Sequence, residues 1–107
     1  MSNIEMTAAA KKACAEALSK VLADTYGLYL KTHNFHWNVE GPRFRSLHQV
    51  FEEQYQDLWG SIDDIAERIR ALGHYAPGTY AKLKALATVN DNEEIPAADA
   101  MLRELVA

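Results

Sequence analysis

The sequence lacks several features on which whole classes of protein depend. It has one cysteine, Cys14, in 107 residues, so no disulfide can form within the chain, and we expect a reducing, cytoplasmic environment. No stretch approaches the roughly 18 apolar residues that a membrane-spanning helix needs, so we expect no membrane partner. The first ten residues contain neither Lys nor Arg and no long apolar segment, which argues against a signal peptide.

Positive charge is also scarce. Eleven Lys and Arg face fifteen Asp and Glu, and the formal charge of −4 repels nucleic acid on average. Lys11, Lys12 and Lys20 have no Arg or aromatic companions, which is typical of surface charge near a helix start rather than of a DNA-binding arm. We therefore expect no strong DNA binding. The length suits a single domain covering residues 1–107.

Helical periodicity dominates what is present. A long helix is predicted from Thr7, a suitable N-cap, to about Trp37. One face of it is marked by residues three or four positions apart: Cys14, Leu18, Leu22, Thr25, Tyr29, Thr32 and His36. Gly27 interrupts this helix at a cost of about 1 kcal/mol relative to Ala, which packing has to offset. Turn-forming residues at 38–42 then predict a reversal of the chain.

A second long helix is predicted after this turn, ending at Gly73. Its apolar positions follow the same spacing throughout: Phe44, Leu47, Phe51, Tyr55, Leu58, Ile62, Ile65, Ile69 and Leu72. A loop at 74–78, a short helix from Thr79 to about Ala87, a polar stretch at 90–94 and a helix beginning near Ala97 complete the chain. We expect an all-α fold in which two long helices form a hairpin, with an apolar stripe that the short helix cannot cover.

Four polar side chains share one flank of the second helix, beside its apolar face. An α-helix turns by about 100° per residue. Measured around the helix axis from His48, Glu52 therefore lies at about 40°, Asp63 at about 60° and Glu67 at about 100°. Their place beside the core predicts partial burial. His48 and Asp63 are nevertheless fifteen residues apart, or about 22 Å along the axis, which is too far for one ion.

A second copy of this helix resolves the distance problem. If two copies cross antiparallel about a two-fold axis near Asp57 and Leu58, the His48 end of one faces Asp63 and Glu67 of the other. His36, across the hairpin turn, can join His48. Imidazole with carboxylate suits iron, manganese or zinc, and the absence of clustered cysteines argues against structural zinc or an iron–sulfur centre. Open coordination positions would favour redox chemistry with iron.

Simpler interpretations apply to other residues. His33 and His74 are interpreted as ordinary hydrogen-bonded histidines. Trp37 and Trp59 are, by physics alone, more often core or interface aromatics than functional groups, and Cys14 is interpreted as a small buried hydrophobe. An alternative function also remains open, a non-enzymatic helical hairpin that docks on partner helices and whose polar flank is only solvated.

Residues 32–44, THNFHWNVEGPRF, carry a resemblance to a known family. With a His twelve residues after His36 and an Asp-x-x-x-Glu pair fifteen residues further on, the chain from about residue 8 onward resembles the Dps family of miniferritins. The resemblance implies an iron site, di-iron or mononuclear, whose ligands come from two subunits, with Trp37 beside it intercepting oxidising equivalents. The ligands so implied are His36, His48 and Glu52 of one subunit and Asp63 and Glu67 of the other.

The resemblance also implies the fold, the activity and the assembly. Members of the family are ferritin-like four-helix bundles in twelve-subunit shells that oxidise Fe(II), commonly with hydrogen peroxide or otherwise with dioxygen, and store the ferric product. This chain would supply the first two long helices, a short linking helix and the start of the third. The sequence has no Lys-rich N-terminal tail of the kind that DNA-binding members use, and no Glu-x-x-His pairs of the ferritins, which favours a site between subunits.

Overall fold

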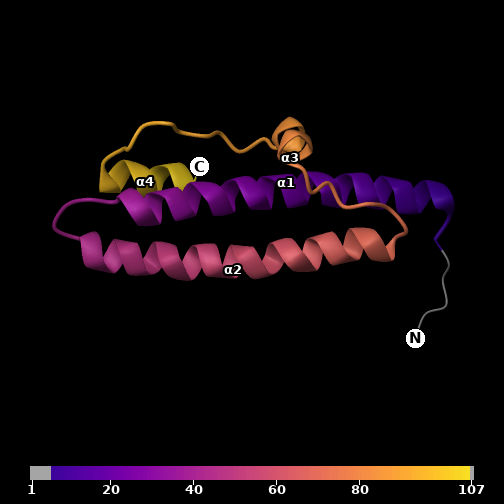
Figure 1. The fold of residues 1–107 in the computed structure, drawn as a ribbon, viewed down its shortest axis with the longest axis horizontal. Helices are drawn as coiled ribbons and strands as arrows, with labels where there is room; N and C mark the ends of the chain where they lie inside the picture. Colours follow the sequence, from indigo (N-terminus) through magenta and orange to yellow (C-terminus); the bar gives the residue numbers. More distant parts are fainter. Residues whose placement is uncertain (1–5, 107) are drawn as a thin grey trace.

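A computed structural model describes residues 6–106, and within that range all regular secondary structure is α-helical. Two long antiparallel helices, α1 (Ala8–Asn38) and α2 (Phe44–Ala71), form a hairpin, while α3 (Tyr80–Leu86) and α4 (Ala98–Val106) lie beside α1 (Figure 1). The molecule measures 55 × 30 × 21 Å, so its shape is set by the hairpin. The predicted helices and the all-α class are confirmed.

Two of the sequence expectations extend beyond the described range. The expected absence of a signal peptide concerns in part residues 1–5, and the predicted last helix included Ala107; both lie outside the described residues. Among the residues that the structure describes, no helix combines the length and the apolar character that crossing a membrane requires.

The ends of the helices follow from short-range chemistry. The hydroxyl of Thr7 accepts a hydrogen bond from the amide of Ala10 at 3.1 Å, and Thr79 caps α3 in the same way through Lys82 at 3.3 Å. Gly73 follows α2 with φ of 87°, a left-handed conformation that glycine adopts without steric cost. The predicted caps and the predicted glycine stop are therefore confirmed.

The interior divides into two clusters, one at each end of the hairpin. Near the turn, the buried residues are Phe35, Val39, Leu47, Phe51 and Met101. At the far end they are Ala15, Leu22 and Ile69. The first cluster contains Met101, which is fully buried and so anchors α4 against both long helices. The predicted apolar stripe of α2 is thus what holds the hairpin together.

Two polar contacts hold the α3–α4 connection against α1. Lys31, only 8% exposed, donates to the carbonyl of Asn90 at 2.8 Å and pairs with Glu104 of α4 at 3.2 Å. Further along α1, the carboxylate of Asp24 accepts hydrogen bonds from the connection at the Thr88 and Val89 amides. These long-range contacts restrain a segment that has no secondary structure of its own.

Gly27, inside α1, faces the connection that follows α3. A Cβ built at this position would lie 3.4 Å from Cβ of Val89, at the inner limit of ordinary contact. At that distance a Cβ would make van der Waals contact with Val89, so the connection after α3 passes close to α1 here. The offset of the propensity cost by packing stays a prediction.

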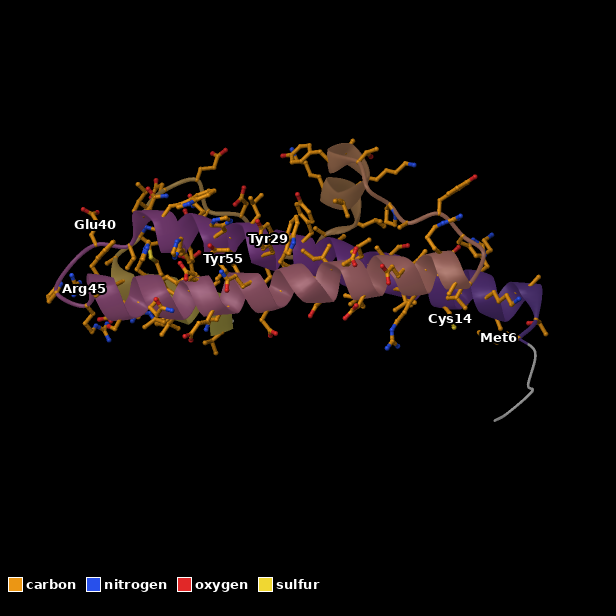
Figure 2. All side chains as sticks on the ribbon, turned by 60° about the horizontal axis from the view of Figure 1, so that its bottom comes forward. Met6, Cys14, Tyr29, Glu40, Arg45 and Tyr55 are labelled. Atoms are coloured by element: carbon orange, nitrogen blue, oxygen red, sulfur yellow. The ribbon has the colours of Figure 1, made fainter. Side chains whose placement is uncertain are left out.

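The interpretation of Cys14 as a buried hydrophobe is wrong. Cys14 is exposed, and the neighbouring Ala15, at 4% exposure, occupies the buried position. Successive residues are about 100° apart around a helix, so an error of one position turns a side chain to solvent. Figure 2 shows Cys14 near the N-terminal end of α1, far from Glu40 and Arg45 at the hairpin turn. Trp37 and Trp59 are 60% and 58% exposed, so neither is a core residue of this chain.

Candidate metal centre

His36 and His48 face each other beside the hairpin turn. His36 lies in the last turn of α1 and His48 in the second turn of α2, and their rings stack with centroids 3.7 Å apart at 20°. Phe44 stacks against His48 at 4.9 Å. His36 is only 6% exposed, and His48 is half-buried. The turn therefore brings together two imidazoles that are twelve residues apart in sequence.

A reciprocal pair of hydrogen bonds orients these two rings. Nδ1 of His36 lies 2.7 Å from the backbone oxygen of His48, and Nδ1 of His48 lies 2.7 Å from the backbone oxygen of His36. A carbonyl oxygen can only accept, so each Nδ1 carries the proton and donates it. In the neutral rings both Nε2 atoms then hold a free lone pair, which is the tautomer that a metal ion requires.

Glu52 adds a carboxylate to this pair. It lies one helical turn after His48 and is half-buried, and its Oε1 is 4.0 Å from Nε2 of His36. That separation is too long for a hydrogen bond, but an ion with metal–ligand distances of about 2.0–2.2 Å can span it. Among residues 6–106, these three are the group of His, Cys, Asp and Glu side chains whose ligand atoms all lie within 4.8 Å of one another.

Asp63 and Glu67 lie further along α2 and do not join this group within the chain. Both are exposed, whereas the stripe position had predicted partial burial. The negative charge of Asp63 raises the pKa of Glu67 above the ordinary value, and a hydrogen bond that the protonated Glu67 carboxyl donates to Asp63 adds to this effect. The midpoint of α2 falls between Asp57 and Leu58, as the two-fold arrangement assumes. A role for these acids at a neighbouring subunit stays a prediction.

The sequence interpretation did not anticipate the aromatic surroundings of the histidines. His33 stacks on Tyr55 at 3.9 Å, and the tilted ring of Trp37 lies 3.9 Å from that of His33. The ring of Tyr55 lies 5.1 Å from that of His36. His33 also shares a hydrogen bond with the hydroxyl of Tyr29 at 3.1 Å. The expected hydrogen-bonded state of His33 is thus correct, but its place beside the candidate centre was missed.

Burial sets the protonation of this Tyr–His pair. Burial raises the pKa of the Tyr29 phenol, and the nearby Tyr26 and Tyr55 raise it further. Burial also lowers the pKa of His33, and the neighbouring His36 lowers it further. At neutral pH the phenol therefore keeps its proton and the imidazole is uncharged. A tyrosine four residues before a histidine on one helix face was the sequence signal that could have revealed the pair.

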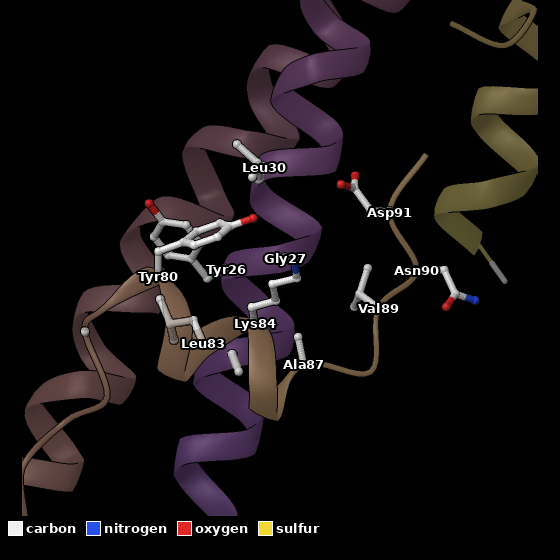
Figure 3. Close-up of a pocket in the computed structure, with 12 residues that line it drawn as sticks. Tyr26, Gly27, Leu30, Tyr80, Leu83, Lys84, Ala87, Val89, Asn90 and Asp91 are labelled. Carbon is white, nitrogen blue, oxygen red and sulfur yellow. The ribbon is translucent and has the colours of Figure 1, made fainter. Parts of the chain in front are cut away.

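A cavity of about 470 Å³ lies elsewhere, between α1 and α3 (Figure 3). Its walls include Tyr26 and Leu30 of α1 and Tyr80 and Leu83 of α3, and it contains no histidine. Its apolar lining offers few groups that could bind a metal. Within residues 6–106, the side chains that could hold a metal ion together lie near the hairpin turn instead.

Comparison with known proteins identifies the class. A family model for the ferritin-like domain matches residues 15–107, so the chain is a ferritin-like protein. The solved Dps protein of Vibrio cholerae O1, described as a member of the ferritin-like diiron-carboxylate proteins, superposes with a TM-score of 0.91 at 29% identity over 99% of this chain and 67% of that one. Antigen TpF1 of Treponema pallidum superposes with a TM-score of 0.91 at 32% identity over 98% of this chain and 68% of that one.

Curated relatives narrow the class to a family. DNA protection during starvation protein 2 of Bacillus anthracis is 37% identical over 95 residues, which cover 89% of this chain and 65% of that protein. An uncharacterized low temperature-induced protein of Nostoc is 43% identical over 105 residues, 97% of this chain and 59% of that protein. The chain belongs to the Dps family of miniferritins, as the resemblance implied. It spans about 59% of the length of the Nostoc relative.

Proposed function

We propose that this chain is a ferroxidase subunit that oxidises Fe(II), with hydrogen peroxide as the expected oxidant, for iron storage and detoxification in the cytoplasm. The observation that carries the proposal is the reciprocal hydrogen bonding of His36 and His48, which leaves both Nε2 lone pairs free beside Glu52. Membership of the Dps family supports it. We further propose an assembly through an antiparallel two-fold interface and, by family, a shell of twelve subunits.

The chemistry of the donor set fits iron as the substrate. Two imidazoles and the carboxylate of Glu52 would hold Fe(II) from one subunit, and Asp63 and Glu67 of a second copy would complete the site. Carboxylates favour the more highly charged ferric product, and a site with few protein ligands leaves positions open for the oxidant. Two Fe(II) ions supply the two electrons that break the peroxide O–O bond, giving two hydroxide ions and two Fe(III).

A double substitution tests the site. Replacing His48→Ala together with Asp63→Ala removes one proposed ligand from each side of the interface, and we expect fast Fe(II) oxidation by peroxide to be lost. Ferric absorbance followed by stopped flow measures this, with helix content checked by circular dichroism. The matched control, His74→Ala with Asp64→Ala, makes the same changes outside the proposed site and should oxidise Fe(II) like the wild type. Equal rates in the two double variants would reject the site.

Metal-dependent melting separates this proposal from the helical docking module. A ligand that binds only the folded state at one hundred times its Kd adds about 2.7 kcal/mol to the free energy of unfolding. Zn(II), used as a redox-inert probe, should therefore raise the melting temperature of the wild type and of the control pair, but not of the His48→Ala and Asp63→Ala pair. No rise in any of the three proteins would favour the docking module.

A further inference from the structure

Trp59 is a large exposed aromatic residue on the flank of α2 that carries the proposed ligands. Measured around the helix axis from His48, it lies at about 20°, within the range that these ligands cover. Its side chain is 58% exposed, although a tryptophan of a folded chain is usually well covered. The Tyr29 ring supports it from within the chain, at 5.2 Å between centroids. The exposed remainder of the indole can contact a second molecule.

The proposed ligands define one register for two antiparallel copies of α2. When the copies cross about the midpoint of this helix, each residue lies opposite the residue of the partner subunit that is equally far from the midpoint on the other side. His48 then lies opposite Glu67 of the partner subunit, and Glu52 lies opposite Asp63 of the partner subunit. The mean direction of these four positions, about 50° from His48, is the side of α2 that faces the partner.

Trp59 and Gln56 are the residues nearest the crossing point that point toward the partner in this register. They are equally far from the midpoint of α2 and lie at about 20° and about 80°, on either side of the facing direction. Both are exposed. The indole of Trp59 therefore lies opposite Gln56 of the partner subunit, whose side-chain oxygen can accept a hydrogen bond from the indole N–H.

The acidic residues of the same flank do not favour this crossing before a metal ion binds. Glu52 lies opposite Asp63 of the partner subunit, and the two-fold axis repeats this opposition of like charges. Two carboxylates that face each other repel until a cation lies between them. An apolar contact at the crossing point has to offset that repulsion if the subunits are to meet without metal.

We propose that Trp59 is the central anchor of an interface with a second copy of this chain, seated against Gln56 of the partner subunit. This inference rests on the proposed ferroxidase function, because the shared site supplies the register. Tryptophan is among the residues that dominate binding energy at the centres of interfaces, where the surrounding contacts exclude water. Each dimer contains the contact twice, and it holds the two halves of each site together.

Sedimentation equilibrium without metal, over a range of concentrations of the full chain, tests the anchor. Trp59→Ala should raise the concentration of half-assembly at least about tenfold, as at an interface hot spot, and Trp59→Phe, which keeps a ring, should raise it less. Val50→Ala is the matched control, because Val50 is 38% exposed and lies about 150° away from the facing direction. It should assemble like the wild type, and circular dichroism checks the helix content of all variants.

Tryptophan fluorescence locates the contact without altering the anchor. The chain has two tryptophans, so Trp37→Phe leaves Trp59 as the single emitting indole. Its emission maximum should move to shorter wavelength as sedimentation of the same variant shows assembly, because the indole leaves water. An emission maximum that stays constant on assembly overturns the placement of Trp59 in the interface.

Fe(II) oxidation by peroxide, measured on the same proteins, keeps the two proposals distinguishable. Trp59→Ala should oxidise Fe(II) slowly at low protein concentration and recover as it assembles at high concentration, which the loss of a ligand would not allow. Assembly of Trp59→Ala like the wild type, or oxidation that stays lost after it assembles, overturns the role of Trp59 alone. A wild type that assembles normally but does not oxidise Fe(II) overturns the ferroxidase proposal, and the register derived from it, while sedimentation still reports on the anchor.

Discussion

At the scale of single residues, the orientation of the two histidines depends on backbone as much as on side chains. The carbonyl groups of His36 and His48 each accept from the opposite ring, so the two helices that carry these proposed ligands also select their tautomer. Such outer contacts commonly matter for metal affinity by about 10–100-fold. The proposed donor set is therefore oriented in advance, which lowers the reorganisation that binding would require.

Glu52 offers a test of the charge at this site. Glu52→Gln keeps the size of the side chain and removes its negative charge, and we expect Zn(II) affinity to fall at least tenfold, which corresponds to about 1.4 kcal/mol. Isothermal titration at neutral pH measures the affinity. Glu53→Gln, a change at the adjacent exposed position, is the matched control and should leave affinity unchanged. Equal losses in both variants would show only a general effect of net charge.

At the scale of elements, Asp24 joins α1 to the connection after α3. The Thr88 amide lowers the pKa of this carboxyl most strongly, with help from the Thr88 hydroxyl and the Val89 amide, while partial burial opposes the shift. The Thr88 amide, the Thr88 hydroxyl and the Val89 amide thus all donate to the one carboxylate of Asp24 on α1. Hydrogen bonds to a charged group contribute about 1.5–3 kcal/mol when buried, and solvent exposure reduces this to about 1 kcal/mol here.

Asp24→Asn should therefore lower the free energy of unfolding by about 1 kcal/mol at neutral pH, measured by urea denaturation. Because the folded pKa is depressed, the stabilisation is fully present above the ordinary pKa of 3.8 and is lost as the pH falls through the lower folded value. The difference between wild type and variant should accordingly shrink below about pH 4. Asp64→Asn, at an exposed position of α2, serves as the control. A difference that stays constant to low pH would contradict this account.

At the scale of the whole molecule, the proposed site belongs to two chains. His36, His48 and Glu52 lie together, while Asp63 and Glu67 lie 11 and 15 residues after Glu52 along α2 and face solvent in a single chain. An antiparallel copy crossing at the middle of α2 would bring the two halves together twice per dimer. A chain in which one half is substituted should then be complemented by a partner in which that same half is intact.

Mixed assemblies test this arrangement. A chain with His36→Ala and His48→Ala and a chain with Asp63→Ala and Glu67→Ala should each fail to oxidise Fe(II) rapidly. After the two are unfolded and refolded together in equal amounts, half of the dimers are mixed, and each mixed dimer has one intact site. About a quarter of wild-type activity should therefore return. A mixture as inactive as its components would reject a site shared between subunits.

Local chemistry determined much of this protein from the sequence alone. The helices with their caps at Thr7 and Thr79, the stop at Gly73 and the hairpin follow from propensity and periodicity, which act between near neighbours. The spacing of the two imidazoles across the turn also predicted that they would meet. The exposure of Cys14 was not determined in this way, because a helical repeat of 3.6 residues leaves the phase of a face uncertain by one position.

Only the tertiary structure decided how those residues face one another. The reciprocal hydrogen bonds of His36 and His48 and the stacking of His33 on Tyr55 depend on how α1 and α2 are rotated against each other. That rotation is set by the simultaneous packing of the two apolar clusters, and each cluster joins residues that are far apart in the sequence. Periodicity predicts which face is buried, while ring stacking and tautomer require positions defined to a fraction of an ångström.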